Sequence, residues 1–468
     1  MERLASAVLS LGLLAAACSG AEEAALEPPV TSSAPATTVG APATTGAPAP
    51  ATTAAPTTTA AAPATTAAAD PADPADPAEP AEPGDGGDGD ESSADTEPAD
   101  ESLDPLSAEI QDWLDRTGAP GIVLAITRGG AEPMTFAWGV SDIASDTPMT
   151  VDHHVRIGSV TKSVTAAVVL QLVAEGAVEL DAPVARYLGD NWAPGYEHAA
   201  AVTVRALLGH TSGFVEYAFD AQFYRPAAPR LDEQISPQEI LEFAAGYGPV
   251  AELGTEYHYN TTGYVAAGLL IEAVTGNTAA AELRSRVFEP LGLEHVYLTP
   301  EEFPPEPTAN GYVGGTLGYL MGPLLGLSSD NQITHNGAIF VDIGTVPGEF
   351  ARSAGWTGGG IEAQIGDVAL LIRGLFATDI LDQEQIALMT TGHPDPADTS
   401  GLGISTREIM GLGVYRHGGG VPGFRTIAAY VPGVDLGVAI TANLLGIDDA
   451  DNVEELLVTL APILATMG

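Results

Sequence analysis

Apolar residues recur with a regular period only from about residue 104 onward. Leu106, Ile110 and Leu114 are spaced as on one face of a helix. The stretch "GIVLAITRGGAEPMTFAWGV" follows, and its two apolar runs on either side of Gly129-Gly130 predict two β-strands joined by a turn. The folded part of the chain is therefore expected to begin with a helix and a β-hairpin.

The end of the chain shows the same two kinds of element in the opposite order. "TIAAYVPGVDLGVAITAN" predicts a second hairpin that turns at Pro432-Gly433, and a final helix is expected from Asp451, with Glu454 placed for a capping-box-like start. Between these two ends, the apolar residues are spaced mainly as in helices. Residues 104–468 are therefore predicted to adopt an α+β fold, an antiparallel sheet flanked by helices with an inserted helical lobe, and they are enough for a large core.

Residues 19–103 show neither helical nor strand periodicity. Their first part is rich in Ala, Thr and Pro, and the second part, from "ADPADPADPAEPAEP" onward, is acidic. Such a composition buries too little apolar surface to offset the entropy of ordering. Frequent prolines and like charges also keep a chain extended. We expect a disordered tether that holds the domain at 104–468 away from a cell surface.

Residues 1–18 have the pattern of an export signal. The apolar run from Leu4 to Ala17 follows Arg3 and is too short to span a bilayer comfortably. It ends in "LAAAC", which resembles a bacterial lipobox, so Cys18 is expected to carry lipid and to become the mature N-terminus. The alternative is ordinary secretion with cleavage after an alanine. Cys18 is the only cysteine, so an exported domain would fold without internal disulfides.

The charge of the chain excludes some partners. Asp and Glu number 62 against 16 Lys and Arg, a net charge of −46 at pH 7. Nucleic-acid binding needs a basic stripe, and docking on an anionic membrane needs a basic patch, so neither is expected. A GC-rich genome would explain much of the shortage of lysine. It would not explain the position of the single lysine, Lys162.

Lys162 stands three residues after Ser159 in "IGSVTKSVT". Val164, Val168 and Leu172 repeat every four residues, so a helix that begins near Ser159 places Ser159 and Lys162 on one face. A serine becomes a nucleophile when a neighbour takes its proton. A buried lysine can do this, whereas arginine stays protonated. The pair predicts a serine nucleophile with its base; the alternative is a helix N-cap serine followed by a lysine in solvent.

Two further stretches give this pair a context. "GTEYHYNTTGYVAAGLLIEAVTG" and "YRHGGGVPGF" follow "RIGSVTKS" in the order and rough spacing of the serine penicillin-recognising enzymes. The chain resembles the β-lactamase-related serine hydrolase family, which includes class C β-lactamases, D-alanyl-D-alanine carboxypeptidases, esterases and aminohydrolases. The resemblance covers essentially all of 104–468, and its supporting stretches are "LDAPVARYL" at 180–188, "VRALLGHTSGF" at 204–214 and "GGGIEAQIGDVALL" at 358–371.

The resemblance implies a role for each matching residue of the first two motifs. Ser159 would be acylated, and Lys162 would accept its proton or tune the local field. Tyr259 takes the tyrosine position of the family's Tyr-x-Asn motif and would relay the proton to the leaving group. The asparagine position is Thr261, with Asn260 one residue early. Because a hydroxyl replaces an amide donor there, efficient recognition of a β-lactam or a peptide is in doubt.

The family's third motif, Lys-Thr-Gly or His-x-Gly, is matched by His417-Gly418-Gly419. The resemblance places His417 opposite Ser159 on a strand, while Gly419 lets substrate lie against that strand. The backbone N–H groups of Gly420 and Ser159 would form the oxyanion hole. A histidine with an ordinary pKa of about 6.5 would lose its positive charge near neutral pH, so substrates with a carboxylate would gain less from it there.

Other patterns are negative or structural. The chain has no His-Glu-x-x-His motif and no cysteine pair, and its glycine runs do not join a strand to a helix, so no metal, nucleotide or other cofactor is expected. His210 in "GHTSGF" is expected to be structural and to tie a loop. Residues 300–355, which include "GGTLGYLMGPLLGL", match the family poorly and are expected to shape the pocket entrance.

These features predict an extracytoplasmic serine hydrolase that acts through an acyl-enzyme on a small amide or ester, with D-amino-acid or peptidoglycan-like peptides among the candidate substrates. The alternatives are a true class C-like β-lactamase and a non-catalytic penicillin-binding-like sensor or scaffold. The presence of Ser159, Lys162 and Tyr259 favours an enzyme. The membrane is expected as a partner through the lipid anchor only, and the oligomeric state is left open.

Overall fold

The computed structural model describes residues 104–218, 220–224, 230–314, 317–318, 329–345, 348–394, 399–446 and 453–467. All of them belong to one compact unit. The expected signal segment at 1–18 with Cys18, and the expected tether at 19–103, lie outside the described residues. No helix in the described ranges is long and apolar enough to cross a bilayer.

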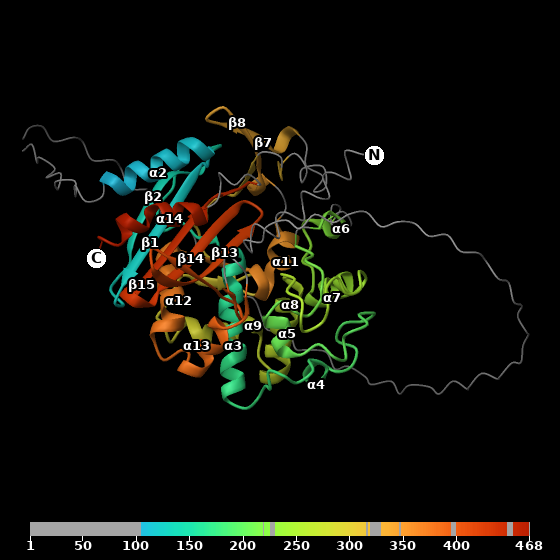
Figure 1. Cartoon of the computed structure of the whole chain (residues 1–468). Helices are drawn as coiled ribbons and strands as arrows, with labels where there is room; N and C mark the ends of the chain where they lie inside the picture. Colours follow the sequence, from blue (N-terminus) through green and yellow to red (C-terminus); the bar gives the residue numbers. More distant parts are fainter. Residues whose placement is uncertain are drawn as a thin grey trace, which may run out of the picture. The chain divides into compact units, whose positions relative to one another are not determined.

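A nine-stranded antiparallel sheet forms the centre of the described chain (Figure 1). Its strands in spatial order are β10 (His393–Pro394), β11 (Thr399–Ser400), β12 (Ser405–Ile409), β13 (Leu412–Val421), β14 (Phe424–Val431), β15 (Leu436–Ala442), β1 (Gly121–Arg128), β2 (Met134–Asp142) and β3 (Thr147–Pro148). β1 and β2 form one predicted hairpin, and β14 and β15 form the other around a turn at Pro432–Val434. Because β15 pairs with β1, the two ends of the domain meet inside one sheet.

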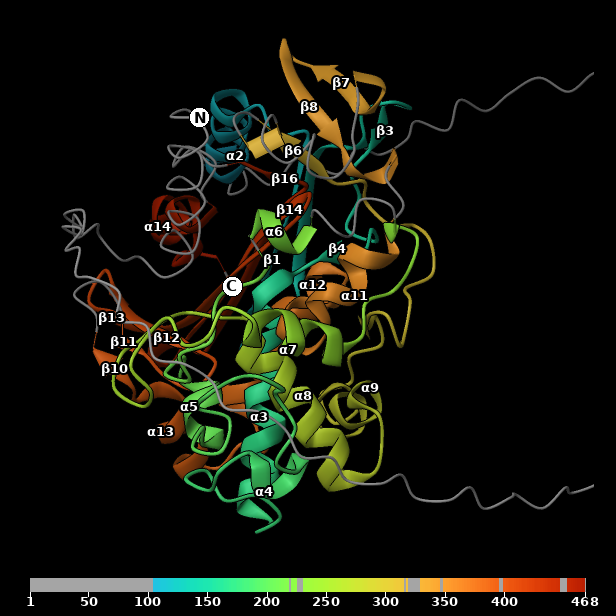
Figure 2. The ribbon, with the colours of Figure 1, turned by 90° about the vertical axis from the view of Figure 1, so that its right-hand side faces the viewer.

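The helices in the described ranges divide into two that cover the outer face of the sheet and others that cover its inner face or build the lobe. The outer pair is α2 (Asp104–Thr117) and α14 (Val453–Leu464). The remaining helices are α3 (Thr161–Ala174), α4 (Ala185–Leu188), α5 (Val204–Leu208), α6 (Ala221–Tyr224), α7 (Pro237–Ala245), α8 (Thr262–Thr275), α9 (Ala279–Leu283), α11 (Glu349–Gly359), α12 (Ile365–Ala377) and α13 (Gln383–Thr390). Figure 2 shows α4, α5, α7, α8 and α9 grouped around α3. The predicted α+β fold with an inserted helical lobe is confirmed.

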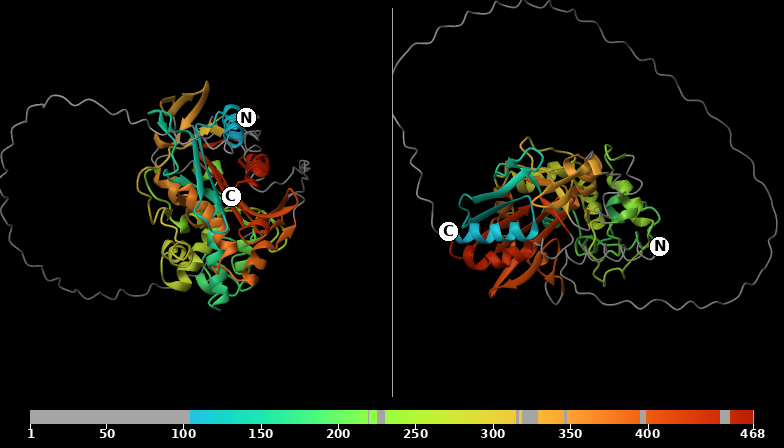
Figure 3. Two further views of the ribbon diagram at one scale, coloured as in Figure 1. Left: turned by 90° about the vertical axis from the view of Figure 1, so that its left-hand side faces the viewer. Right: turned by 90° about the horizontal axis from the view of Figure 1, so that it is seen from above.

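Strand β1 shows why the sheet needs a cover on both faces. Ile122, Leu124 and Ile126 belong to an apolar cluster with α2 and α14, while Val123 and Ala125 belong to a second cluster with α3 and α12. Successive side chains of a strand point to opposite faces, so the continuous apolar run of this strand is buried twice. Figure 3 shows α2 and α14 side by side on one face, with the other helices on the opposite face.

Two small sheets lie in the middle of the chain, where the sequence pattern predicted helices. Their strands, in spatial order, are β16 (Leu444–Leu445), β6 (Tyr312–Gly314), β8 (Ala338–Asp342) and β7 (Gln332–His335) in one, and β4 (Val155–Arg156), β9 (Ile361–Ala363) and β5 (Val296–Leu298) in the other. Strands of two to five residues are too short to show a clear period. β4 leads into Ser159, and β9 follows α11, so their pairing aligns two segments that reach the site.

The region 300–355 contributes β6, β7, β8 and the first part of α11. Most of "GGTLGYLMGPLLGL", at 315–316 and 319–327, lies outside the described residues. Its expected role at the pocket entrance therefore stays a prediction.

Candidate active site

Ser159 lies in a short 3-10 turn, Gly158–Val160, rather than in the first turn of the α-helix. Helix α3 begins two residues after Ser159, at Thr161. The relation expected from the spacing holds nevertheless, because Lys162 Nζ donates a hydrogen bond to Ser159 Oγ at 3.0 Å. The prediction that Ser159 and Lys162 share a face is confirmed.

Lys162 is completely buried, so the alternative of a lysine in solvent is wrong. Its Nζ also donates to Thr261 Oγ1 at 3.1 Å and to the Gly358 carbonyl oxygen at 2.6 Å. These three acceptors match the three N–H donors of a lysine ammonium group. The nitrogen lies 5.0 Å from the centre of the Tyr259 ring. Lys162 therefore joins the serine turn, the start of α8 and the end of α11.

Strand β13 approaches the serine turn at distances that only glycine allows. Gly158 has a φ of +54°, and a Cβ atom there would lie 2.9 Å from the backbone nitrogen of Gly420. A Cβ atom at Gly419 would lie 2.0 Å from the carbonyl oxygen of Ile157. Glycine accepts both the left-handed φ and the close contact. The structure thus brings the two expected oxyanion residues, Ser159 and Gly420, next to each other.

A kink in α11 aims the carbonyl group of Gly358 at Lys162. Trp356 has φ 33° and ψ −132° inside this helix, a conformation that costs a bulky residue about 1–3 kcal/mol. Its indole Nε1 donates to Glu301 at 2.7 Å. After the kink, the carbonyl oxygen of Thr357 accepts from Thr165 Oγ1 at 2.7 Å. Gly358 is a site residue that the sequence did not reveal, because no local pattern predicts a helix broken at tryptophan.

Thr261 connects Lys162 to a buried acid, Glu216. The backbone N–H and the hydroxyl of Thr261 both donate to Glu216 Oε2, at 2.7 and 2.9 Å. Glu216 Oε1 accepts from the N–H of Ala218 at 2.8 Å. Burial raises the pKa of Glu216, and the charge of Lys162 partly opposes that rise. Glu216 was also missed; its only sequence signal is an acid among apolar residues directly after "GHTSGF".

Tyr259 is held by His210, as the structural role predicted for His210 requires. The two rings stack at a tilt, with centroids 4.4 Å apart. His210 Nδ1 accepts from the N–H of Asn260 at 3.2 Å, and its carbonyl oxygen accepts from the N–H of His258 at 2.8 Å. Burial lowers the pKa of His210 well below its usual value, so the ring is neutral. The structural role of His210 is confirmed.

His417 lies on β13 in the pocket wall, as expected, but its charge differs from the expectation. Burial, followed by the charge of Lys162, lowers the pKa of His417 to about 3. Its Nδ1 lies 2.6 Å from the carbonyl oxygen of Gly418, an acceptor, so the N–H is on Nδ1. The expectation that His417 titrates near pH 6.5 is therefore wrong: the ring is neutral at working pH because it is only 8% exposed.

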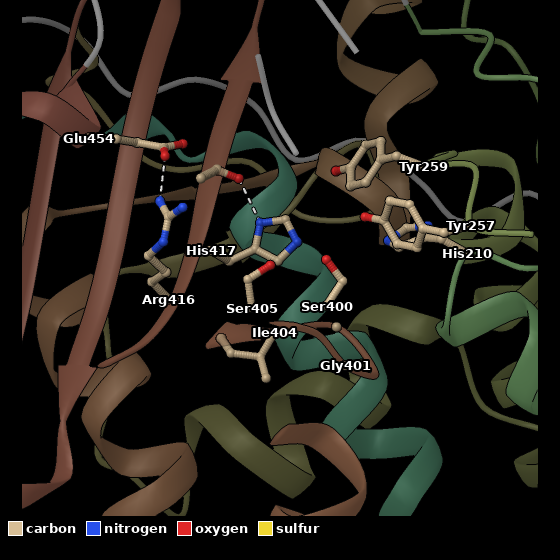
Figure 4. Close-up of a pocket in the computed structure, with 12 residues that line it drawn as sticks. His210, Tyr257, Tyr259, Ser400, Gly401, Ile404, Ser405, Arg416, His417 and Glu454 are labelled. Carbon is tan, nitrogen blue, oxygen red and sulfur yellow. Dashed lines mark hydrogen bonds and ion pairs between the residues drawn. The ribbon is translucent and has the colours of Figure 1, made fainter. Parts of the chain in front are cut away.

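A pocket with about 390 Å³ of empty volume lies beside these residues (Figure 4). Tyr259, Tyr257 and His210 form one side, and His417 lies between them and an ion pair of Arg416 with Glu454. Glu454 was expected near the cap of the last helix; its carboxylate binds Arg416, and Asp451 lies outside the described residues. The pocket therefore offers aromatic rings at one end and both charges at the other.

In the described ranges, no group of three or more His, Cys, Asp and Glu side chains could hold a metal ion. The arrangement that remains is a buried serine and lysine pair, a tyrosine ring against the lysine, and backbone amides of a glycine-rich strand beside the serine. Such a set can activate a hydroxyl nucleophile and stabilise an oxyanion.

Comparison with known proteins identifies the family. The Beta-lactamase family model matches residues 106–461. The crystal structure of a D-amino acid amidase from Ochrobactrum anthropi SV3 is 27% identical, with a TM-score of 0.65, and the match covers 78% of this chain and 100% of that one. The unguisins hydrolase of Aspergillus violaceofuscus is 24% identical over 366 residues, which are 72% of this chain. The D-aminopeptidase of Cereibacter sphaeroides is 25% identical over 350 residues, 73% of this chain.

The chain spans about 60% of the length of each of these last two relatives. The solved amidase, by contrast, is matched over its whole length. The fold, the contact between Ser159 and Lys162 and the family match over 106–461 agree, and we conclude that this chain belongs to the Beta-lactamase family of serine hydrolases.

Proposed function

We propose that this protein hydrolyses small amides and esters of D-amino acids through an acyl-enzyme on Ser159. The observation that carries the proposal is the hydrogen bond between Ser159 Oγ and the fully buried Lys162. A lysine removed from water surrenders its proton more easily than one in solvent, so it can act as a base toward the serine hydroxyl.

The reaction would proceed in two displacements. Ser159 Oγ attacks the carbonyl carbon of the substrate while its proton passes to Lys162, and the developing oxyanion accepts from the N–H groups of Ser159 and Gly420. The carbonyl then re-forms as the bond to the amine or alcohol breaks, while Tyr259 gives its proton to that leaving group and takes the proton from Lys162 in its place. A water molecule then gives a proton to Lys162 and attacks the acyl carbonyl carbon. As the bond to Ser159 Oγ breaks, Lys162 returns that proton to Oγ and the acid is released.

The relatives support the choice of substrate. The similar solved structure is a D-amino acid amidase, and one curated relative is a D-aminopeptidase. Thr261 cannot supply an amide donor, so we expect β-lactam turnover to be slower than that of amides and esters.

A hydrolysis panel tests this function. The substrates are D- and L-phenylalaninamide, a D-Ala-D-Ala peptide, short-chain p-nitrophenyl esters and nitrocefin. We expect the D-amide and the best ester to be hydrolysed faster than the L-amide and nitrocefin. Ser159→Ala should abolish all turnover. Ser163→Ala is the matched control, because Ser163 is also buried and follows Lys162 directly but donates to the Gly403 carbonyl oxygen.

The two alternatives give different outcomes. Nitrocefin hydrolysis that exceeds every amide and ester would identify a β-lactamase. A folded protein with no turnover, whose Ser159 resists a fluorophosphonate, would identify a non-catalytic sensor or scaffold.

We also propose that the protein is exported and held on the outer face of the cell membrane by lipid on Cys18. The support is in the sequence: a short apolar run ending in "LAAAC", a single cysteine and a long Pro-rich and acidic segment before the domain. The fate of a Cys18→Ala variant, described in the Discussion, tests this location.

A further inference from the structure

Glu216 lies directly behind the residues that contact Ser159. Its Oε2 accepts two hydrogen bonds from Thr261, and Thr261 Oγ1 in turn accepts from Lys162 Nζ. The four side chains therefore form one chain from Ser159 through Lys162 and Thr261 to Glu216. Glu216 is 8% exposed and Thr261 is 5% exposed, so water does not compete strongly for these bonds.

The direction of these bonds follows from counting protons. A threonine hydroxyl has one proton, and the carboxylate of Glu216 accepts it at 2.9 Å. Only lone pairs of Thr261 Oγ1 then face Lys162. The Gly358 carbonyl oxygen, 2.6 Å from Nζ, is also only an acceptor. A neutral lysine amine has two N–H donors and one lone pair, and these two acceptors can take both donors. In that state the lone pair faces Ser159 Oγ, 3.0 Å away, and accepts from its hydroxyl, whereas the charged amine donates a hydrogen bond there instead.

We propose that Glu216 is a positioning residue of this active site: through Thr261 it directs the lone pair of Lys162 at Ser159, and its charge sets the pH at which Lys162 can take the serine proton. The proposal rests on the function proposed above. In the first role, Glu216 accepts the proton of the Thr261 hydroxyl. Without Glu216, that hydroxyl could donate to Lys162 and occupy the lone pair that Ser159 needs. In the second role it stabilises the charged lysine between turnovers.

The other titratable groups that face Lys162 are two histidines and two tyrosines. His210 and His417 face Lys162 from the loop and from β13, and burial lowers the pKa of both. Tyr264 and Tyr259 face it from α8 and the preceding loop, with ring centres 5.6 and 5.0 Å from Nζ. Burial raises the pKa of Tyr264 well above its usual value.

The charge of Glu216 also acts on two buried tyrosines, Tyr217 and Tyr224. Burial raises the pKa of both, so they stay neutral. We therefore expect the titration of Lys162 to respond chiefly to the charge of Glu216.

Glu216→Gln tests the effect of charge. The amide keeps the shape and can still accept from Thr261, but it carries no charge. Because Lys162 is the only lysine, ¹³Cε-lysine labelling of the full chain, prepared without a lysine in any tag, gives a single NMR signal that titrates this amine. We expect its midpoint in the variant to move to lower pH by about one unit or more. The rate of fluorophosphonate labelling at Ser159 should fall at low pH as Lys162 takes up a proton. The midpoint of this fall, the acid limb of the pH–rate curve, should move in the same direction.

Glu282→Gln is the matched control. Glu282 is 5% exposed, similar to Glu216, but binds Arg286 and Asn277 in a different part of the fold. This variant should leave the lysine midpoint and the acid limb unchanged. A Glu216→Gln protein with a wild-type midpoint, or with a midpoint moved to higher pH, would overturn the proposed role of the charge.

Thr261→Val tests the direction of the lone pair and does not depend on whether Glu216→Gln folds. The valine has similar size but no hydroxyl, so we expect labelling of Ser159 to slow at least tenfold across the pH range. Thr261→Ser restores the hydroxyl and should recover most of the rate. Wild-type labelling by a folded Thr261→Val protein would overturn the positioning role.

Different results would overturn the proposed hydrolase function and the inference about Glu216. If a fluorophosphonate does not label wild-type Ser159, the proposed hydrolase function fails, whereas the lysine titration still reports the coupling to Glu216. If wild-type Ser159 is labelled but neither variant changes the lysine titration or the labelling rate, the function stands and the inference about Glu216 fails.

Discussion

Lys162→Met tests the central base while keeping most of the shape of a completely buried side chain. The variant removes the group that we propose takes the Ser159 proton, and loss of a general base typically slows a reaction about 10²–10⁴-fold. This corresponds to about 2.7–5.4 kcal/mol of activation free energy. We therefore expect the rate of fluorophosphonate labelling at Ser159 to fall by that factor.

The effect on stability should be smaller than the effect on rate. Without the ammonium group, the Gly358 carbonyl oxygen loses its 2.6 Å partner, which costs about 1–3 kcal/mol. The methionine also avoids the burial of an ammonium group, whereas Glu216 loses its neighbouring cation and can take up a proton instead of remaining a buried charge. We expect the free energy of unfolding to change by about 2 kcal/mol or less, as measured by denaturant unfolding. The folded variant should therefore be abundant while its labelling is nearly abolished.

Lys162→Arg separates charge from proton transfer. Arginine keeps the positive charge beside Ser159 but stays protonated in proteins. If proton transfer is the essential role, this variant should label as slowly as Lys162→Met. The larger guanidinium group strains a packed site by about 1–3 kcal/mol, so cooperative unfolding must be verified first.

The control for loss of a buried cation is Arg373→Met on α12. Arg373 is 12% exposed and pairs with Asp435 at 2.7 Å, in contacts separate from those of Lys162. It should lower stability without changing the labelling rate. A cooperatively folded Lys162→Arg protein that labels Ser159 at the wild-type rate would refute the assignment of Lys162 as the base.

Three further predictions concern other parts of the molecule. Gly419→Ala should reduce turnover about 10²–10³-fold, because its Cβ would lie 2.0 Å from the Ile157 carbonyl oxygen and displace the oxyanion site. Gly413→Ala on the same strand is the control and should keep wild-type turnover, because a Cβ there meets nothing within 4 Å. Equal losses of turnover in both variants would contradict the prediction for Gly419. His417 has a pKa of about 3 in the fold, so below its unfolded value of about 6.5 the unfolded chain binds the extra proton and stability falls as the pH drops toward 3. Between pH 6.5 and 5, His417→Asn should lose about 1–2 kcal/mol less unfolding free energy than the wild type in denaturant titrations, and parallel curves would show that the site does not bury a neutral ring. Cys18→Ala should release the protein from the membrane fraction or block its maturation, whereas a wild-type protein found wholly soluble outside the cell would exclude the lipid anchor.

The spacing of apolar residues was enough to predict the elements in which that spacing stays regular. The run "GIVLAITRGGAEPMTFAWGV" folds as β1 and β2, and the last predicted hairpin folds as β14 and β15. The pairing of Ser159 with Lys162 is local too, because three residues of helix geometry place both side chains together whatever surrounds them. The family motifs then indicated Tyr259, Thr261 and His417 as neighbours.

Other parts of the site depend on segments that are far apart in the chain. Glu216 meets Thr261 across 45 residues, and the Gly358 carbonyl group meets Lys162 across 196. No period in the sequence records such a meeting, since it requires the lobe to pack and α11 to break at Trp356. The two small sheets were missed for two different reasons. β4 pairs with β9, a distant segment, which no local pattern records. β7 and β8 form a local hairpin at Asn336-Gly337, whose turn signal is present in the sequence and was overlooked.

The sequence by itself therefore determined the α+β class, the two hairpins and the contact between Ser159 and the single lysine of the chain. Only the tertiary structure decided the charges at the site. A pKa depends on how much water a group loses and on which charges surround it, and both are properties of the packed molecule. Burial keeps His417, which lines the pocket, neutral, although the sequence shows only a histidine in a glycine run. Packing brings Glu216 to Thr261 and so close to Lys162, although the sequence shows only an acid among apolar residues.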